Sequence, residues 1–291
     1  MKRNVLNLSI TLLLLLAATF QVHAQDENYL DEEVTKVWET DPVFKTPESV
    51  YHDTLHEVLY VANINGRPTE KDNNGFISKL SPEGNVIELE WVTGLNAPKG
   101  MGMVDNYLYV TDIDRVVKID VTKGEIVESY PGQDAVFLND IAVGPTGIVF
   151  VSDMSINYIY RLMDNNLEKW LNFYSYPGPN GLFVEYGQLL VGVRSQIVAI
   201  DLATNDMAEF VPRTGGIDGI EGVGDEFYII SDWQGHIYLV HPLRKKRLLS
   251  DTTPENINAA DIEYNPHKKH VYVPTFNDNR VMAYDVSKVV P

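Results

Sequence analysis

The sequence predicts an all-β fold, and three observations lead to that prediction. One unit is written six times, with copies that begin at Glu48, Lys99, Asn139, Asn180, Asp218 and Ala260. Each copy contains short apolar runs separated by turns rich in Gly, Asp, Asn or Pro, which is the pattern of antiparallel strands. Most copies start about forty residues apart, the period of a propeller blade. No stretch shows the 3.6-residue apolar period of a core helix. The prediction is therefore a six-bladed β-propeller with a central channel.

One interval between copies is longer than the others, and an insertion explains it. Between Ile64 and Gly75 the first copy carries NGRPTEKDNN, a polar segment typical of an exposed loop. An ordinary β-sandwich is the alternative all-β architecture, but six regular copies are more than one sandwich uses. Residues 46–291 are therefore expected to form the propeller as one domain.

Residues 1–24 are expected to be a secretory signal peptide. Lys2 and Arg3 precede an apolar run over residues 12–18, and Val22 and Ala24 occupy the minus-three and minus-one positions of a cleavage site. The apolar run is too short to span a bilayer comfortably, and no later segment approaches the required length, so we expect no membrane insertion. The sequence thus predicts export to a periplasmic or extracellular location.

Residues 25–45 are expected to be an N-terminal leader followed by a ring-closing strand. The segment 25–30 and the acidic DEE after it are typical of a loose leader. Residues 33–40 are expected to lie beside residues 281–289 and to complete the last blade, because an open ring would expose two sheet edges.

The composition limits the classes of partner. Removal of Lys2 and Arg3 takes the formal net charge from −18 to −20, which argues against nucleic acid and anionic membranes as partners. The charge is also explained by the solubility of an exported protein. The chain has no cysteine, and therefore no disulfide and no thiolate metal site. The expected partner is a small molecule, and the sequence does not determine the oligomeric state.

The start of each copy is where the innermost strand of a blade begins, so side chains there are expected to face the channel. Glu48, Asn139, Asn180 and Asp218 are oxygen donors at this one phase of the repeat. Carboxylate and amide oxygens without Cys or His are typical ligands of a hard cation, so we expect Ca²⁺, with Mg²⁺, Mn²⁺ or Zn²⁺ as alternatives. The other interpretation stays open, because Asn-Asp, Asn-Gly and Asp-Gly are common turn dipeptides.

Four short motifs resemble those of the regucalcin/gluconolactonase/luciferin-regenerating-enzyme family of six-bladed β-propellers, to which paraoxonases are distantly related. The resemblance runs from about Thr46 to the C-terminus and rests on PESVYHD, FLNDIAV, GPNGLFV and GIDGIEG, which contain Glu48, Asn139, Asn180 and Asp218 in turn. It implies that Glu48, Asn180 and Asp218 are direct metal ligands. It also implies that Asp218 is the catalytic general base and that Asn139 is a catalytic residue near the substrate.

Two residues set this chain apart from the family pattern: Phe137, which replaces an Arg, and Lys99, which adds a positive charge. Sugar-lactone members carry Arg two residues before the Asn-Asp pair, where this chain has Phe137, which disfavours sugar-acid lactones as substrates. Lys99 either holds a substrate carboxylate or phosphate, or extends to the channel rim. Asn139, Lys99 and Phe137 are therefore assigned to substrate binding, and a lactone or ester with an apolar or aromatic substituent is expected.

Two function classes follow from these assignments. The first is metal-assisted hydrolysis of lactones or related esters, in which the cation polarises the carbonyl and Asp218 removes a proton. The second is a non-catalytic extracellular propeller that binds a ligand or partner and holds a structural calcium. The GxSxG, GxxxxGK and HExxH signatures of other enzyme classes are missing from the sequence.

Other polar and aromatic residues that recur in the repeat receive a structural interpretation. Asp112, Asp153 and Asp232 follow the LYV-type strand and are interpreted as turn residues that bond their own backbone. Trp233 is interpreted as a residue that packs between blades.

Overall fold

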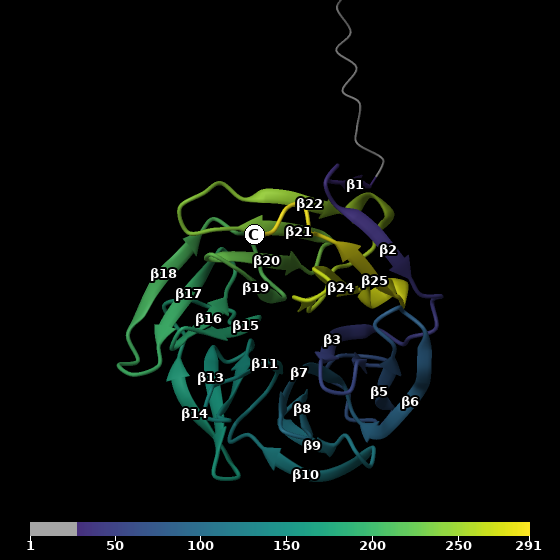
Figure 1. Ribbon diagram of the computed structural model, residues 1–291. Coiled ribbons are helices and arrows are strands. Elements are labelled where there is room, and N and C mark those ends of the chain that lie inside the picture. The colour runs from purple at the N-terminus through teal and green to yellow at the C-terminus, as the bar shows by residue number, and fades with distance from the viewer. Residues whose placement is uncertain (1–27) are drawn as a thin grey trace, which may run out of the picture.

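The computed structural model describes residues 28–291, which form a ring of six antiparallel sheets around a central axis (Figure 1). The predicted six-bladed β-propeller is therefore confirmed. The predicted signal peptide, residues 1–24, lies outside the described residues. Within residues 28–291 the helical segments are two short 3-10 helices, η1 (Thr253–Glu255) and η2 (Phe276–Asp278). No helix in this part of the chain is long and apolar enough to cross a membrane.

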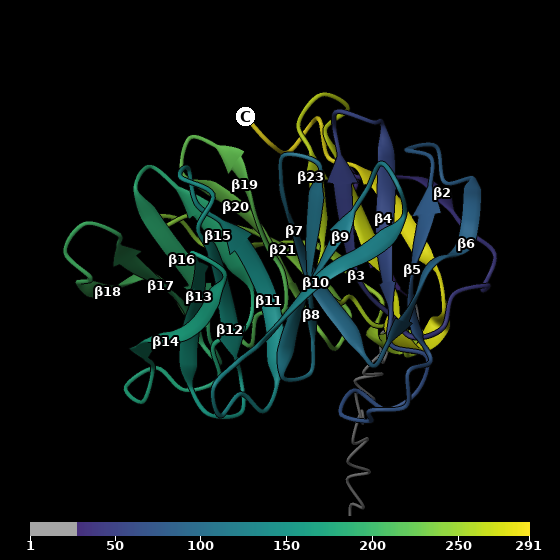
Figure 2. The same cartoon turned by 90° about the horizontal axis from the view of Figure 1, so that it is seen from below.

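The strands of each blade follow one another from the axis outward, and the inner strands run along the axis of the ring (Figure 2). Blades one to three consist of β3 (Pro47–Asp53), β4 (Val58–Asn63), β5 (Gly75–Leu80) and β6 (Val86–Leu95); β7 (Pro98–Val104), β8 (Tyr107–Asp112), β9 (Arg115–Asp120) and β10 (Glu125–Pro131); and β11 (Leu138–Val143), β12 (Val149–Asp153), β13 (Tyr158–Met163) and β14 (Asn166–Asn172). Blades four to six consist of β15 (Leu182–Glu185), β16 (Gln188–Gly192), β17 (Gln196–Asp201) and β18 (Met207–Pro212); β19 (Ile220–Gly224), β20 (Phe227–Asp232), β21 (His236–Val240), β22 (Arg247–Asp251) and β1 (Tyr29–Leu30); and β23 (Glu263–Asn265), β24 (His270–Pro274), β25 (Val281–Asp285) and β2 (Thr35–Glu39).

The N-terminal strand β2 closes the ring. It pairs antiparallel with β25 and forms the outer strand of blade six. The ring of Trp38 on β2 stacks on Tyr272 of β24, with centroids 5.8 Å apart. The Trp38 indole nitrogen also donates a hydrogen bond of 3.2 Å to the carbonyl oxygen of Pro82 in blade one. The strand thus ties the last blade to the first.

The segment before β2 is attached to blade five. Strand β1 pairs with β22, with Tyr29 opposite Asp251. The guanidinium of Arg247 donates hydrogen bonds of 2.8 and 2.7 Å to the two carboxylate oxygens of Asp31, which is buried. The expectation of a loose leader is therefore wrong from Tyr29 onward, because strand pairing and this ion pair hold the segment in place.

The apolar core is divided among the gaps between neighbouring blades. Six clusters of buried side chains each combine residues from two adjacent blades. Between blades five and six, for example, Ile229 and Leu239 pack with Val271 and Met282. Burial of one such side chain contributes about 1.5–3 kcal/mol. Each blade therefore depends on both of its neighbours for stability.

Adjacent inner strands approach each other so closely at the axis that a side chain does not fit between them. A Cβ atom on Gly181 would lie 2.4 Å from the backbone oxygen of Asp218, and one on Gly219 would lie 2.5 Å from the backbone nitrogen of Ile262. Neither glycine has a positive φ, and neither does Asn180 or Asp218. The Asn-Gly and Asp-Gly pairs are therefore not tight turns, and their glycines permit the contact between blades.

Hydroxyl groups on the second strands hold the inner strand of the next blade. Thr111 Oγ1 donates a hydrogen bond of 2.6 Å to the carbonyl oxygen of Asn139. Ser231 Oγ donates one of 2.7 Å to the carbonyl oxygen of Ala260. Both hydroxyl residues are fully buried, so these bonds fix the backbone at two of the predicted channel positions.

The aspartates that follow these hydroxyl residues bind backbone groups. Asp153 and Asp232 accept hydrogen bonds from backbone N–H groups two and three residues later, which confirms their interpretation as turn residues. Asp153 also accepts hydrogen bonds of 2.8 and 3.2 Å from the backbone of Val136 and Phe137, just before β11. Asp112 accepts bonds of 2.9 and 2.8 Å in the same way, from the backbone of Asn96 and Ala97 just before β7. Asp112 and Asp153 therefore each position the start of the next inner strand.

The close contact at Gly181 generates a prediction about stability. Gly181→Ala should lower the free energy of unfolding by about 1–3 kcal/mol, because the added methyl group forces two inner strands apart. Gly216→Ala is the matched control, because its Cβ would meet nothing nearer than the Arg194 carbonyl oxygen at 4.0 Å. Urea denaturation measures both variants. Equal stability of the two would contradict the requirement for glycine at this contact.

Candidate functional site

Three of the predicted channel residues form a hydrogen-bonded row at the starts of blades three, four and five. Nδ2 of Asn139 donates to Oδ1 of Asn180, which lies 41 positions later in the sequence. Nδ2 of Asn180 donates to Oδ1 of Asp218 at 2.6 Å, across 38 positions. The fold therefore brings residues that are distant in sequence into direct contact, with a carboxylate at the end of the row.

Glu48 and Asn139 each have a buried oxygen atom without a hydrogen-bond partner among residues 28–291. These atoms are Glu48 Oε2 and Asn139 Oδ1, and the two residues are only 6% and 5% exposed. A buried acceptor without a partner costs about 1–3 kcal/mol. A hard cation would satisfy such oxygens, so the donor set of Glu48, Asn180 and Asp218 with Asn139 nearby fits the predicted ion.

The carboxylates of this site have raised pKa values. Burial raises the pKa of Asp218 to about 6, and the hydrogen bond from Asn180 opposes this rise because it stabilises the charged form. Burial also raises the pKa of Glu48 well above its usual range, and the nearby Asp218 charge raises it further. The ammonium group of Lys99 acts in the opposite direction on Glu48. A bound cation would lower both pKa values, because it favours the ionised carboxylates.

The two predicted substrate-binding residues that differ from the family pattern contact each other. Lys99 is 1% exposed, and its Nζ lies 4.6 Å from the centroid of the Phe137 ring. The same Nζ donates a hydrogen bond of 2.9 Å to the carbonyl oxygen of Ala97. Lys99 is thus buried beside Glu48 and does not extend to an exposed rim.

A cavity of about 770 Å³ adjoins the hydrogen-bonded row, and we call it the mouth cavity. Asn180 and Asp218 line it together with Arg194, Trp233 and Lys246, whereas Lys99 and Phe137 do not. Trp233 of blade five packs edge-on against Phe276 of blade six, as a residue that packs between blades would, but it is also 48% exposed and lines the mouth cavity. It lies in the turn between β20 and β21.

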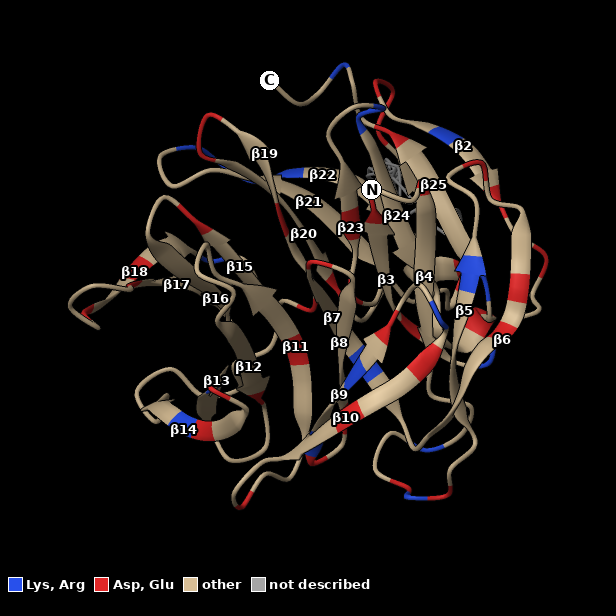
Figure 3. Cartoon of the chain, turned by 60° about the horizontal axis from the view of Figure 1, so that its bottom comes forward, with Lys and Arg blue, Asp and Glu red and all other residues tan. Residues whose placement is uncertain are grey.

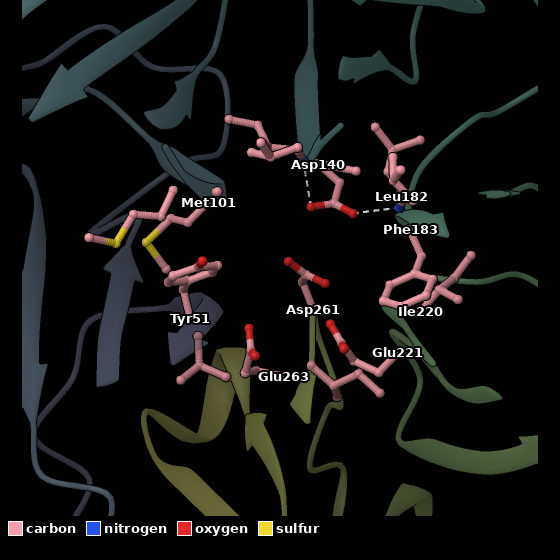
Figure 4. A pocket seen from close by; sticks show the side chains of 17 residues that line it. Tyr51, Met101, Asp140, Leu182, Phe183, Ile220, Glu221, Asp261 and Glu263 are labelled. Atoms are coloured by element: carbon pink, nitrogen blue, oxygen red, sulfur yellow. Dashed lines mark hydrogen bonds between the residues drawn. The ribbon is translucent and has the colours of Figure 1, made fainter. Parts of the chain in front are cut away.

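Four further carboxylates point into the channel, and the sequence analysis did not identify them. Asp140, Glu221, Asp261 and Glu263 surround a cavity of about 230 Å³ together with Tyr51 (Figure 4). We call them the channel carboxylates. Figure 3 shows acidic segments on the inner strands β11 and β23, in line with this arrangement. Asp140 accepts hydrogen bonds from the backbone of Ile141 and Leu182, each of 2.6 Å. Asp261 accepts one of 2.7 Å from Ser49 Oγ.

Burial is the main cause of raised pKa values among the channel carboxylates. It raises the pKa of Glu263 to about 8. The pKa values of Asp140, Glu221 and Asp261 are also well above the usual range, because burial and the neighbouring carboxylates both disfavour ionisation. Within residues 28–291, no three His, Cys, Asp or Glu side chains are grouped so that they could hold a metal ion.

The fold and the site define this chain as a six-bladed β-propeller with a polar channel. The chain is similar to the solved structure of a streptogramin B lyase, with a TM-score of 0.61 and 15% sequence identity over 88% of this chain and 97% of that chain. A similarity at this identity shows the fold alone. No known protein-family profile and no curated protein matches the sequence. The resemblance to the regucalcin/gluconolactonase family stays a prediction.

The raised pKa values generate a prediction about pH. A carboxyl group whose folded pKa lies above its unfolded value stabilises the fold at low pH, and this contribution is lost as the pH rises through the folded pKa. With Asp218 at about 6 and Glu263 at about 8, the protein in a metal chelator should be more stable at pH 5 than at pH 8.5.

Thermal unfolding at the two pH values measures this difference. Glu263→Gln should reduce it, because the amide does not ionise. Glu168→Gln is the control, since Glu168 lies on the outer strand β14 and pairs with Arg161. A chelated protein that gains stability from pH 5 to pH 8.5 would contradict the assignment.

Proposed function

We propose that this protein is an exported, divalent-cation-dependent hydrolase of lactones or related esters that acts at the channel mouth. The observation that carries the proposal is the hydrogen-bonded row Asn139–Asn180–Asp218, which ends on a carboxylate beside a cavity of about 770 Å³. Export rests on the predicted signal peptide, and hydrolysis rests on the residue types and on the resemblance of the four motifs.

Glu48, Asn180 and Asp218 are the residues that would hold the cation, with Ca²⁺ as the first choice. The unpartnered Glu48 Oε2 supports this assignment. When bound, such a cation polarises a carbonyl group and lowers the pKa of water. The neighbouring Asn139 Oδ1, also without a partner among the described residues, is a hydrogen-bond acceptor for a substrate hydroxyl group or for water.

Asp218 has the properties of a general base. Without a cation its pKa is about 6, and a bound cation would lower this pKa, so the carboxylate is ionised at neutral pH and able to accept a proton. Asn180 donates to Oδ1, and the hydrogen bonds among residues 28–291 leave Oδ2 without a donor. Asn180 therefore fixes the orientation of the carboxylate, and Oδ2 is the atom that would receive the proton.

One observation favours a second candidate function, a non-catalytic propeller that binds a ligand or partner and holds a structural calcium. The buried Lys99 places a positive charge beside Glu48, which supplies part of the charge compensation that a catalytic cation would otherwise provide. Turnover of lactones or esters separates the two candidates, because only the hydrolase consumes its ligand.

The cation assignment predicts a change in stability. Calcium at one hundred times its Kd should stabilise the chelator-treated protein by about 2.7 kcal/mol, because it binds only the folded state. Glu48→Gln should reduce the calcium-induced rise in Tm, whereas Glu221→Gln, a matched change among the channel carboxylates, should preserve it. Identical melting curves with calcium and with chelator would rule out a calcium ion bound by Glu48, Asn180 and Asp218.

The catalytic assignment predicts a separation of binding from turnover. Asp218→Asn keeps an oxygen donor of similar shape but removes the base, so kcat should fall by about 10²–10⁴-fold while calcium binding weakens less. Asn139→Ala should lower kcat/KM with little loss of calcium affinity. Steady-state kinetics across a panel of lactones and esters, with calorimetric titration of calcium, measures both effects. Full activity of Asp218→Asn would show that the base is another group.

A further inference from the structure

The mouth cavity contains two cationic side chains that the hydrolase proposal does not use. Arg194 lies in the turn between β16 and β17, and Lys246 lies just before β22. Both are exposed and line the same cavity as Asn180 and Asp218. Within residues 28–291 neither side chain forms an ion pair, although the chain as a whole carries 41 acidic and 23 basic residues. Unpaired cations beside a candidate catalytic site in an acidic protein point to an anionic ligand.

Arg194 and Lys246 are both held by local contacts. The side chain of Arg194 packs over Gly178, where its Cγ and Nε lie 3.3 Å from the place that a Cβ would take. Gly178 lies only two residues before Asn180, so the guanidinium stem covers the segment that leads into the hydrogen-bonded row. Lys246 Nζ donates a hydrogen bond of 2.9 Å to the carbonyl oxygen of Thr214 and lies 4.0 Å from the centroid of the Tyr238 ring.

The surrounding charges leave both cations free to bind a ligand. Asp232, the other acidic residue of the mouth cavity besides Asp218, is paired with Nδ1 of His236 at 2.9 Å. A neighbouring cavity of about 900 Å³ shares Thr214 and Lys246 with the mouth cavity and adds Arg213, Arg244 and Lys245, with Glu209 as its one acidic lining residue. The linings of the two cavities together hold five basic residues and three acidic ones, so their net charge is opposite in sign to that of the whole protein.

An apolar surface lies in the same cavity as the two cations. Trp233 is 48% exposed, and its ring packs edge-on against Phe276 with centroids 5.5 Å apart. Asn258 Nδ2 donates a hydrogen bond of 2.8 Å to the Trp233 carbonyl oxygen, which holds the backbone of this turn. Met154, 38% exposed, adds apolar area to the cavity. A fixed aromatic ring beside cationic groups suits a ligand with both an apolar body and an anionic group.

We infer that the mouth cavity binds an apolar or aromatic substrate with a carboxylate or phosphate substituent, whose anionic group lies against Arg194 and Lys246 and whose body packs on Trp233. This inference rests on the proposed function, because it names the substrate class of the same site. It assigns recognition of the anion to Arg194 and Lys246, since Lys99 is buried outside the cavity.

Calorimetric titration of phenylphosphonate, in the presence of a metal chelator, tests the anion site without catalysis. The unmodified protein should bind phenylphosphonate more tightly than neutral benzamide. Arg194→Gln and Lys246→Gln should each weaken phenylphosphonate binding by about tenfold, the loss expected for one charged hydrogen bond. Lys118→Gln is the matched control, because Lys118 lies over Tyr107 at 4.1 Å in blade two and outside both cavities. Added salt should weaken binding through screening.

Kinetics in calcium test the same subsite during turnover. Mono-4-nitrophenyl adipate and 4-nitrophenyl hexanoate differ in one terminal carboxylate, and kcat/KM should favour the adipate. Arg194→Gln should lower this preference, whereas the control Lys118→Gln should leave kcat/KM for both esters unchanged. Phenylphosphonate binding that is absent, or equal in the unmodified protein and both charge variants, would overturn the anion site. Phenylphosphonate binding with the expected variant pattern, but without turnover of any ester or lactone, would support the anion site and overturn the proposed hydrolase.

Discussion

The structure depends on the apolar packing between neighbouring blades. Each of six buried clusters takes its residues from two adjacent sheets, so an open gap would expose two apolar faces at once. Strand β2 completes blade six by pairing with β25, and its Trp38 packs against the cluster between blades six and one and donates a hydrogen bond to the carbonyl oxygen of Pro82 in blade one, which closes that gap. Closure in turn forces six inner strands to converge at the axis. Gly100, Gly181 and Gly219 stand where the next inner strand leaves no room for a Cβ atom.

The same convergence creates the chemistry of the channel. Side chains that begin inner strands are brought together in a narrow space where most of them are buried, and charged groups are costly there. Buried carboxylates are retained there despite this cost, and their pKa values rise because ionisation is disfavoured. Raised pKa values in a cavity are characteristic of functional sites, although structural networks also produce them. The mouth offers amide and carboxylate oxygens beside a large cavity, whereas the channel carboxylates surround a smaller one.

The position of a residue within the repeat was the sequence feature that identified the hydrogen-bonded row. It predicted that Asn139, Asn180 and Asp218 share a place in successive blades, and hydrogen bonds join them in the structure. Position within the repeat did not identify Asp140, the residue that follows Asn139. A register shift between Leu138 and Ile141 interrupts the alternation of side chains in β11, so a period of two does not predict which residues face the channel. Arg194 and Lys246 were missed, and Trp233 was assigned to packing alone, because all three lie on loops, whose direction follows from no periodic pattern.

The sequence by itself determined the number of blades and the residue types at the axis, because both are written into a local repeat of apolar runs and turns. The tertiary structure alone decided how those residues meet. It showed that Gly181 and Gly219 serve a contact between blades and not a turn, and that Lys99 is buried against Phe137. It also placed two cations and an exposed indole beside Asp218. These relations depend on distances between segments far apart in the chain, which only the closed ring sets.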